Sequence, residues 1–283
     1  MHFLCIKDQS MADVQRIFHT ADRLRDNEAQ VLKGKTFVLF FPESSIRTRL
    51  SFEKGIQDLG GVCVLFPPST LDKREALIDV VKYIENWADG IIVRHPDYDK
   101  VCELAAAADI PVINAMTASN HPCEILSDLY SIRKLRGDFK GLTYTFVGEH
   151  GNISNSWCNA AEAFDFKLNH VSVIGNRIKA DEANYTFSTC LETVLPMTDV
   201  VLTDPLSEAF RTKEYIDRYQ ITLERMKTCR PKALLNPCPP FYRGEEVSAD
   251  VIDSEYFVGY EFKKNLIYVQ QAIVLHCLGV DLI

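Results

Sequence analysis

The chain has 283 residues, of which 47% are hydrophobic and 25% are charged, and its net charge is −8. This length is enough for two domains of ordinary size, and the composition is that of a globular protein. The acidic charge argues against a nucleic-acid-binding surface, and no apolar run is long enough to span a membrane. The amino terminus lacks the pattern of a signal peptide, and the nine cysteines form no Cys-x-x-Cys pair, so we expect a cytoplasmic protein with reduced thiols.

The first half of the chain alternates between strand and helix patterns. Residues 10–31 are predicted to form an amphipathic helix with Ser10 as its N-cap. Apolar runs typical of strands follow at residues 36–41, 62–66, 90–93 and 111–114, with helical patterns at 46–59, 75–87 and 100–108. Continuous apolar strands alternating with helices predict a parallel sheet that is covered on both faces. A long helix at 121–135 is expected to stop at Arg136-Gly137.

A second alternation begins after this helix. Strands are expected at residues 142–147, 168–174, 200–203 and 233–236, and a helix at 153–164. The last apolar helix, at 266–278, has no strand after it, and we expect it to pack beside helix 10–31. The prediction is therefore an α/β protein with two doubly wound parallel-sheet domains joined by interdomain helices. The domains are expected to comprise residues 1–137 with 265–283, and residues 138–264.

The most informative segment is Ser45-Ile-Arg-Thr-Arg49, which follows a predicted strand and opens a predicted helix. Ser45, Arg47 and Thr48 would lie in the first helical turn, where free N–H groups and the helix dipole favour an anion. A guanidinium and two hydroxyls at that place predict a phosphate site. A surface helix start with solvated arginines is the alternative for this motif taken alone.

Two further polar clusters follow other strands of the same predicted sheet. Arg94-His-Pro96 ends the strand at 90–93, and His121-Pro-Cys-Glu124 opens the long helix. Ligands of open α/β sheets gather at the carboxyl ends of strands, so the three clusters are expected to converge. A zinc site at His121 and Cys123 is not expected, because residues two apart on a helix diverge and further ligands are missing.

Together with Asn236-Pro-Cys-Pro-Pro240, these motifs resemble, in order and spacing, the signatures of the aspartate/ornithine carbamoyltransferase family. The resemblance implies an enzyme that moves the carbamoyl group of carbamoyl phosphate to an amine. It also implies a first domain that binds carbamoyl phosphate, a second that binds the amine, no metal or cofactor, and a homotrimer with shared sites. Ornithine is the expected acceptor, in amino-acid metabolism and arginine biosynthesis.

The resemblance also implies residue roles. Ser45, Ile46, Arg47 and Thr48 would hold the phosphate, and Lys73 would reach it from a neighbouring subunit. Arg94 and His121 would contact the carbonyl oxygen and Glu124 the carbamoyl NH2, so that the catalytic set is Arg47, Thr48, Arg94 and His121. The amine set would be Asn152, Asp204, Asn236, Pro237, Cys238 and Lys263.

The sequence departs from the family pattern at several positions. Family members commonly carry glutamine where this chain has Glu124, and a histidine where it has Asn236. The Ser-Met-Gly segment expected after Asp204 is absent. These departures leave open an acceptor other than ornithine, such as aspartate, and a non-catalytic subunit that keeps the fold. A nicotinamide-dependent dehydrogenase is disfavoured, because Gly148-x-x-Gly151 lacks the full glycine fingerprint and no acid ends the next strand.

Overall fold

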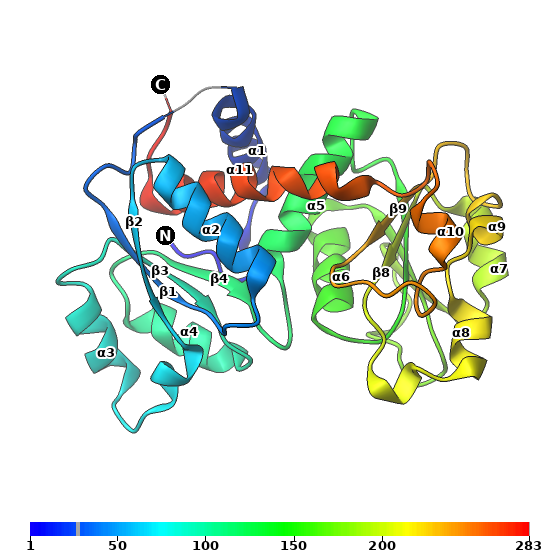
Figure 1. Cartoon of the computed structure of the whole chain (residues 1–283), viewed down its shortest axis with the longest axis horizontal. Helices are drawn as coiled ribbons and strands as arrows, with labels where there is room; N and C mark the ends of the chain where they lie inside the picture. Colours follow the sequence, from blue (N-terminus) through cyan, green and yellow to red (C-terminus); the bar gives the residue numbers. More distant parts are fainter. Residues whose placement is uncertain (27–28, 283) are drawn as a thin grey trace. The chain divides into compact units, whose positions relative to one another are not determined.

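A computed structural model describes residues 1–26 and 29–282. The chain forms two compact units, Met1–Ser131 with Lys263–Ile283, and Ile132–Phe262. Helices α5 (Pro122–Arg136) and α11 (Gly259–Leu278) both cross this division. Each unit contains one sheet whose strands all pair in parallel, with helices between successive strands except between β6 and β7 (Figure 1). The predicted fold class is confirmed.

The sheet of the first unit has the strand order β2-β1-β3-β4. Its strands are β1 (Thr36–Phe40), β2 (Val62–Phe66), β3 (Gly90–Arg94) and β4 (Val112–Met116). Its helices are α1 (Met11–Asp26), α2 (Ile46–Asp58), α3 (Leu77–Ile84) and α4 (Tyr98–Ala107), with short 3₁₀ turns at Ile6–Asp8 and Pro68–Asp72. Buried aliphatic side chains of β1 and β3 form its centre, among them Val38, Ile91 and Val93.

The start of α1 follows the sequence prediction, whereas its end does not. The Asp13 N–H donates to Ser10 Oγ at 3.2 Å, which confirms Ser10 as the capping residue. The helix ends at Asp26, so the prediction of a helix to residue 31 is too long; residues 27 and 28 lie outside the described residues. At the other end of the chain, Arg23 donates to the Leu282 carbonyl at 2.7 Å. The chain end that follows α11 therefore returns to α1, as expected.

Strand β2 differs from the expectation of a sheet covered on both faces. It pairs with β1 alone and forms one edge of the sheet. Val62, Val64 and Phe66 share one face and expose 56%, 40% and 43% of their surface. The expectation is wrong for this strand, because at the sheet edge no element of the described chain covers that face.

The sheet of the second unit has the order β7-β6-β5-β8-β9. Its strands are β5 (Thr143–Val147), β6 (Lys167–Val171), β7 (Tyr185–Ser188), β8 (Val200–Thr203) and β9 (Leu234–Pro237). Helix α6 (Asn152–Phe164) is followed by the shorter α7 (Leu191–Val194), α8 (Lys213–Tyr219), α9 (Leu223–Met226) and α10 (Ala249–Ile252). Short 3₁₀ turns lie at Leu195–Met197 and Glu208–Phe210.

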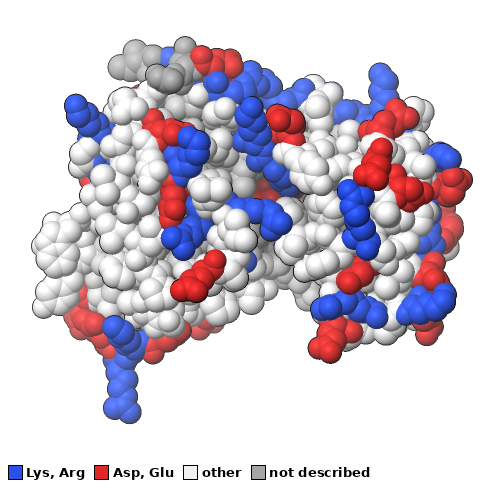
Figure 2. All heavy atoms as spheres, viewed as in Figure 1, with Lys and Arg blue, Asp and Glu red and all other residues white. Residues whose placement is uncertain are grey.

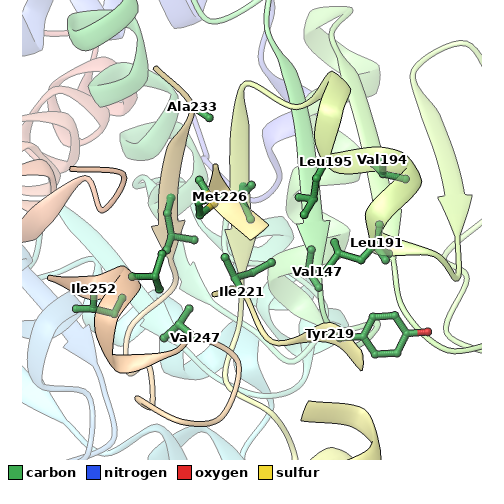
Figure 3. Packing of buried hydrophobic residues seen from close by; sticks show 14 of the residues in the cluster. Val147, Leu191, Val194, Leu195, Tyr219, Ile221, Met226, Ala233, Val247 and Ile252 are labelled. Atoms are coloured by element: carbon green, nitrogen blue, oxygen red, sulfur yellow. The ribbon is translucent and has the colours of Figure 1, made fainter. Parts of the chain in front are cut away.

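The short helices of the second unit complete its core. Leu191, Tyr219, Met226 and Ile252 come from four of them and pack in one buried cluster with strand residues such as Val147 (Figure 3). Strand β7 and helices α7 to α10 were not expected from the sequence. Short segments carry too few periodic positions to be recognised, and their stability comes from this packing.

Each sheet has one topological switch point, at which the order of successive strands changes direction across the sheet. In the first sheet it lies between β1 and β3, and in the second between β5 and β8. The loops that leave adjacent strands on either side of such a point diverge and form the usual ligand site of an open α/β sheet. Among the helices described, none is long and apolar enough to cross a membrane.

Candidate active site

The first switch point brings together Ser45 and Arg94. Ser45 follows β1 and is the N-cap of α2, and Arg94 is the last residue of β3, the strand next to β1. The Arg94 guanidinium donates to Ser45 Oγ at 2.9 Å. Thr48 and Arg47 both lie in the first turn of α2, where Thr48 is buried and Arg47 is exposed. A guanidinium therefore already lies at the anion-favouring start of a helix.

Ile46 contributes differently from its neighbours. Its backbone N–H donates to the Ser44 carbonyl at 3.0 Å, and its side chain is 71% exposed. The N–H groups of Arg47 and Thr48, in the same turn, have no acceptor inside an α-helix by its geometry. The anion-binding part of this turn is therefore centred on Ser45, Arg47 and Thr48 rather than on Ile46.

A polar network fixes the loop that ends at His121. The Asn114 side-chain amide, on β4, donates to Asn120 Oδ1 at 2.6 Å, and Thr117 Oγ1 donates to the same oxygen at 2.8 Å. The Asn120 N–H returns a bond to Thr117 Oγ1 at 3.1 Å. Because these side chains are buried, the loop holds one geometry and delivers His121 to the start of α5.

His121 is buried, and burial lowers its pKa from 6.5 to about 4. The Glu124 carboxylate raises the pKa, while the positive charges of Arg94 and Lys263 lower it. These electrostatic effects place His121 in the same cluster as Arg94 and Glu124. At neutral pH the imidazole is uncharged and can donate one N–H bond to a carbonyl oxygen without being a strong acid.

Glu124, one turn into α5, forms a buried ion pair with Lys263. The Lys263 ammonium lies 2.6 Å from Glu124 Oε1 and 2.6 Å from Asp128 Oδ1. Burial alone raises the pKa of Glu124, but the charges of Lys263 and Arg47 outweigh this and lower it. Glu124 is therefore a carboxylate, and Lys263 is engaged by two acids of α5.

Lys73 does not join this cluster in the structure. It lies at the end of the 3₁₀ turn Pro68–Asp72, in an exposed loop. Its neighbour Asp72 lies 3.1 Å from His95 Nε2 and also pairs with Lys100. Within the described part of the chain, no hydrogen bond or ion pair connects Lys73 with Ser45, Arg94 or His121.

The second switch point lies next to Asn152 and Asp204. Asn152 is the first residue of α6, after the loop that leaves β5, and Asp204 follows β8, the strand next to β5. The two loops are tied together, because the Ser207 N–H donates to Glu149 Oε1 at 2.8 Å. Gly148 has a φ of 154°, and a Cβ there would lie 3.2 Å from the Phe146 ring, so the turn out of β5 favours glycine.

The segment Asn236-Pro-Cys238 ends β9, on the other side of β8. Leu202 and Thr203 of β8 are in register with Asn236 and Pro237. The Cys238 N–H donates to the Thr203 carbonyl at 2.9 Å, so this segment continues the ladder beyond the strand. Asn152, Asp204 and Asn236–Cys238 therefore follow three adjacent strands at the same edge of the second sheet.

The sequence prediction missed Asp128. This residue is buried and holds Lys263 together with Glu124. Its position four residues after Glu124 puts both carboxylates on one face of α5, which is a signal that the sequence already contained. The sequence did not indicate that Lys263 is the cation between them, because that pairing depends on the return of α11.

Two family descriptions match the chain. Residues 1–134 match the carbamoyl-P binding domain of aspartate/ornithine carbamoyltransferase, and residues 140–277 match the Asp/Orn binding domain. The ornithine carbamoyltransferase of Nitrobacter winogradskyi is 31% identical over 98% of this chain and 97% of its own length. That of Hydrogenovibrio crunogenus is 32% identical over 96% of both chains.

Solved structures of ornithine carbamoyltransferases are also similar to this chain. The ornithine carbamoyltransferase from Burkholderia thailandensis E264 is 30% identical, with a TM-score of 0.90 over 98% of each chain. The Thermus thermophilus structure of the same name is 26% identical, with a TM-score of 0.89 over 98% of each chain.

Proposed function

The chain belongs to the aspartate/ornithine carbamoyltransferase family, and on this premise we propose that it transfers the carbamoyl group of carbamoyl phosphate to ornithine and releases phosphate. It is a carbamoyltransferase enzyme. The observation that carries the proposal in this chain is the 2.9 Å bond between Arg94 and Ser45 at the switch point of the first sheet, next to the start of α2. It assembles an anion site of the kind that a phosphate substrate requires.

In this proposal, the first unit binds carbamoyl phosphate. Ser45, Arg47 and Thr48 hold the phosphate through hydroxyls, backbone N–H groups and a guanidinium. Arg94 bridges the phosphate and the carbonyl oxygen, and the uncharged His121 donates to the same oxygen. Glu124 accepts from the carbamoyl NH2. Ile46 has a minor part, since its N–H is already bonded to Ser44.

The chemistry needs no covalent intermediate on the protein. The neutral amine of the acceptor attacks the carbonyl carbon, a C–N bond forms, and negative charge builds on the carbonyl oxygen. The bond from that carbon to the phosphate oxygen then breaks, phosphate leaves with the bonding electrons, and the new amide nitrogen gives its extra proton to the departing phosphate. Arg94, His121 and Thr48 stabilise the oxyanion, and Arg47 stabilises the leaving phosphate. One such donor typically lowers the barrier by about 3 kcal/mol.

The second unit binds the acceptor in this proposal. Asn152 holds the amino-acid end of ornithine, and the Asp204 carboxylate pairs with its ammonium. Asn236, Pro237 and Cys238 line the same sheet edge and contact the acceptor near the reacting nitrogen. We do not assign Lys263 to the acceptor-binding residues, because its ammonium already lies 2.6 Å from both Glu124 and Asp128.

We further propose that the enzyme is a homotrimer in which Lys73 serves the site of a neighbouring subunit. The exposed position of Lys73 supports this, because a lysine in such a loop can reach another chain. The open apolar face of β2 supports it too, together with Ile46 and Leu50 of α2, which are 71% and 60% exposed. Figure 2 shows few charged side chains over the side of the first unit that carries β2 and α3. Exposed apolar patches of this kind mark protein interfaces.

A panel of acceptors tests the proposal. Phosphate release from carbamoyl phosphate is measured with ornithine, putrescine, lysine, aspartate and diaminopropionate. Ornithine is expected to give the highest kcat/KM, which agrees with our proposal that the enzyme acts in arginine biosynthesis in the cytoplasm. A best rate with aspartate would overturn the acceptor, and no release with any amine would favour the non-catalytic alternative that the Glu124 and Asn236 departures leave open.

A further inference from the structure

The start of α11 places one lysine against two buried acids. Glu124 and Asp128 lie one turn apart on α5 and are 5% and 3% exposed. Lys263, far along the sequence, lies 2.6 Å from one oxygen of each. A buried carboxylate is costly unless a cation with good hydrogen-bond geometry compensates its charge. Lys263 supplies that compensation to both acids.

The pairing leaves one oxygen of Glu124 for another partner. Lys263 contacts Oε1, and within the described residues no hydrogen bond reaches Oε2. Glu124 lies in the electrostatic field of His121, which precedes α5, and of Arg47 on α2, and it influences His121 in turn. Oε2 therefore belongs to a carboxylate, which can only accept hydrogen bonds, within the cluster that also contains Arg94.

We propose that Lys263 is a positioning residue for the carbamoyl group: it holds Glu124 by Oε1, so that Oε2 accepts a hydrogen bond from the carbamoyl NH2. This rests on the proposed function of the first unit. Lys263 then offsets part of the negative charge that Glu124 introduces in place of the neutral glutamine that family members commonly carry. The lysine also limits the repulsion between Glu124 and the phosphate dianion, which the glutamate would otherwise introduce.

The pair is also a specificity determinant. Acetyl phosphate has the shape of carbamoyl phosphate but carries a methyl group in place of the NH2. A methyl group cannot donate to Oε2, and it leaves a desolvated carboxylate oxygen without a partner. Sites built to accept a hydrogen bond discriminate strongly against the analogue that lacks the donor. The wild-type enzyme is therefore expected to bind carbamoyl phosphate much more tightly than acetyl phosphate.

The test compares Lys263→Met, Lys263→Arg, Glu124→Gln and the double variant Glu124→Gln/Lys263→Met in the full-length enzyme. Lys264→Met is the control, because it removes the same charge from the next, exposed position of α11. For each we measure KM for carbamoyl phosphate, KM for ornithine, kcat, and inhibition by acetyl phosphate. Circular dichroism and thermal unfolding show whether each variant is folded.

Lys263→Met is expected to raise KM for carbamoyl phosphate by roughly 10- to 100-fold, by analogy with the loss when the partner that orients a metal ligand is removed. It should also reduce the discrimination against acetyl phosphate. Lys263→Arg should keep most of both properties. The double variant should recover most of the discrimination against acetyl phosphate, because glutamine needs no cation and its carbonyl can still accept from NH2. Its thermal stability should not recover fully, since the buried Asp128 loses Lys263 in both variants. Glu124→Gln alone should cost less than Lys263→Met.

Each other outcome identifies a different error. If Lys263→Met raises KM for ornithine and not for carbamoyl phosphate, Lys263 belongs to the amine set and the inference is wrong. An equal loss for carbamoyl and acetyl phosphate, without rescue by Glu124→Gln, would mean that Lys263 only stabilises the fold. If Lys263→Met does not fold, the double variant and Lys263→Arg still decide through the discrimination ratio. A wild-type enzyme without phosphate release overturns the proposed function instead.

Discussion

Arg94 and Arg47 both contact the phosphate in the proposed site, but their surroundings differ. Arg94 donates a hydrogen bond to Ser45, whereas Arg47 is exposed. We expect Arg94→Ala or Arg47→Ala to lower kcat by about 10²-fold or more, because each removes a positive group from the oxyanion or the leaving phosphate. Steady-state phosphate release measures this, and circular dichroism checks the fold.

Arg49→Ala is the matched control for the two arginines. Arg49 lies on the same helix, and its guanidinium is 2.9 Å from Glu53 in an i,i+4 pair. Such pairs contribute little, so its turnover should stay within a few-fold of wild type. Near-wild-type release by both Arg47→Ala and Arg94→Ala would sink the proposed site.

The neutral state of His121 has a consequence for stability. Its folded pKa of about 4 lies below the unfolded value of 6.5, so the unfolded chain binds more protons between these values. The free energy of unfolding should therefore fall as the pH falls through this window, by up to about 1.4 kcal/mol per pH unit from this group. His121→Gln should flatten the slope, as measured by urea unfolding at several pH values. The slope should not vanish, because burial also lowers the pKa of His170 to about 4. An unchanged slope would contradict a neutral, buried His121.

Asp204 tests the acceptor side. If its carboxylate pairs with the ammonium at the amino-acid end of ornithine, Asp204→Asn should raise KM for ornithine by about tenfold or more while changing KM for carbamoyl phosphate little. The other nitrogen of ornithine attacks and must be neutral. Free alkyl amines titrate near pH 10, so the rate should rise with pH across the neutral range. Asp217→Asn, on exposed α8, is the control. Equal effects on both substrates would contradict the assignment.

At the residue scale, the sequence predicted the clusters that follow strands but not the partners that arrive from far along the chain. Ser45 and Arg94 were expected together because both follow the carboxyl ends of strands in one parallel sheet, and their side chains bond at 2.9 Å. The Lys263 pairing was not predicted, because it joins residues 135 and 139 positions apart. Only the tertiary return of α11 brings them together.

At the scale of elements, long apolar strands were predictable and short helices were not. β2 and β8 have the predicted bounds, because each is a continuous apolar run. α7, α9 and α10 have four residues each, fewer than an isolated helix needs, and they exist because their apolar side chains complete the second core. Their sequences alone contain little of that information.

Met226 tests how much these short helices contribute. It is fully buried in α9, in the cluster of Figure 3. We expect Met226→Ala to lower the free energy of unfolding by about 2–5 kcal/mol through lost contacts and a cavity. Met197→Ala, at a 52% exposed position of the same unit, should change it by less than about 0.5 kcal/mol. Equal values in denaturant unfolding would mean that α9 does not stabilise the second unit.

At the scale of the whole molecule, the same architectural rule operates twice. Each parallel sheet has one switch point. Ser45 and Arg94 lie at the carboxyl ends of the strands beside the first, and Asn152 and Asp204 follow the strands beside the second. The sequence predicted the convergence of Ser45 and Arg94 at one sheet edge, because the carboxyl ends of parallel strands meet there, but it did not predict the strand order or the switch points. It could not predict which surface is left open, since the exposed face of β2 follows from what the other elements fail to cover.

The proposed trimer makes a quantitative prediction for mixed subunits. In a cyclic trimer every interface is head-to-tail, so each shared site takes Arg47 from one subunit and Lys73 from its neighbour. Lys73→Ala and Arg47→Ala proteins are each expected to be inactive. In an equal mixture that exchanges subunits at random, about a quarter of the sites combine an intact Arg47 with an intact neighbouring Lys73. The mixture should therefore recover about a quarter of wild-type phosphate release.

Native mass spectrometry verifies the exchange. As a control, a mixture of Arg47→Ala with Arg94→Ala should recover nothing, because both changes affect the cluster of the same subunit. If the first mixture also stays inactive after verified exchange, Lys73 does not act across a subunit boundary.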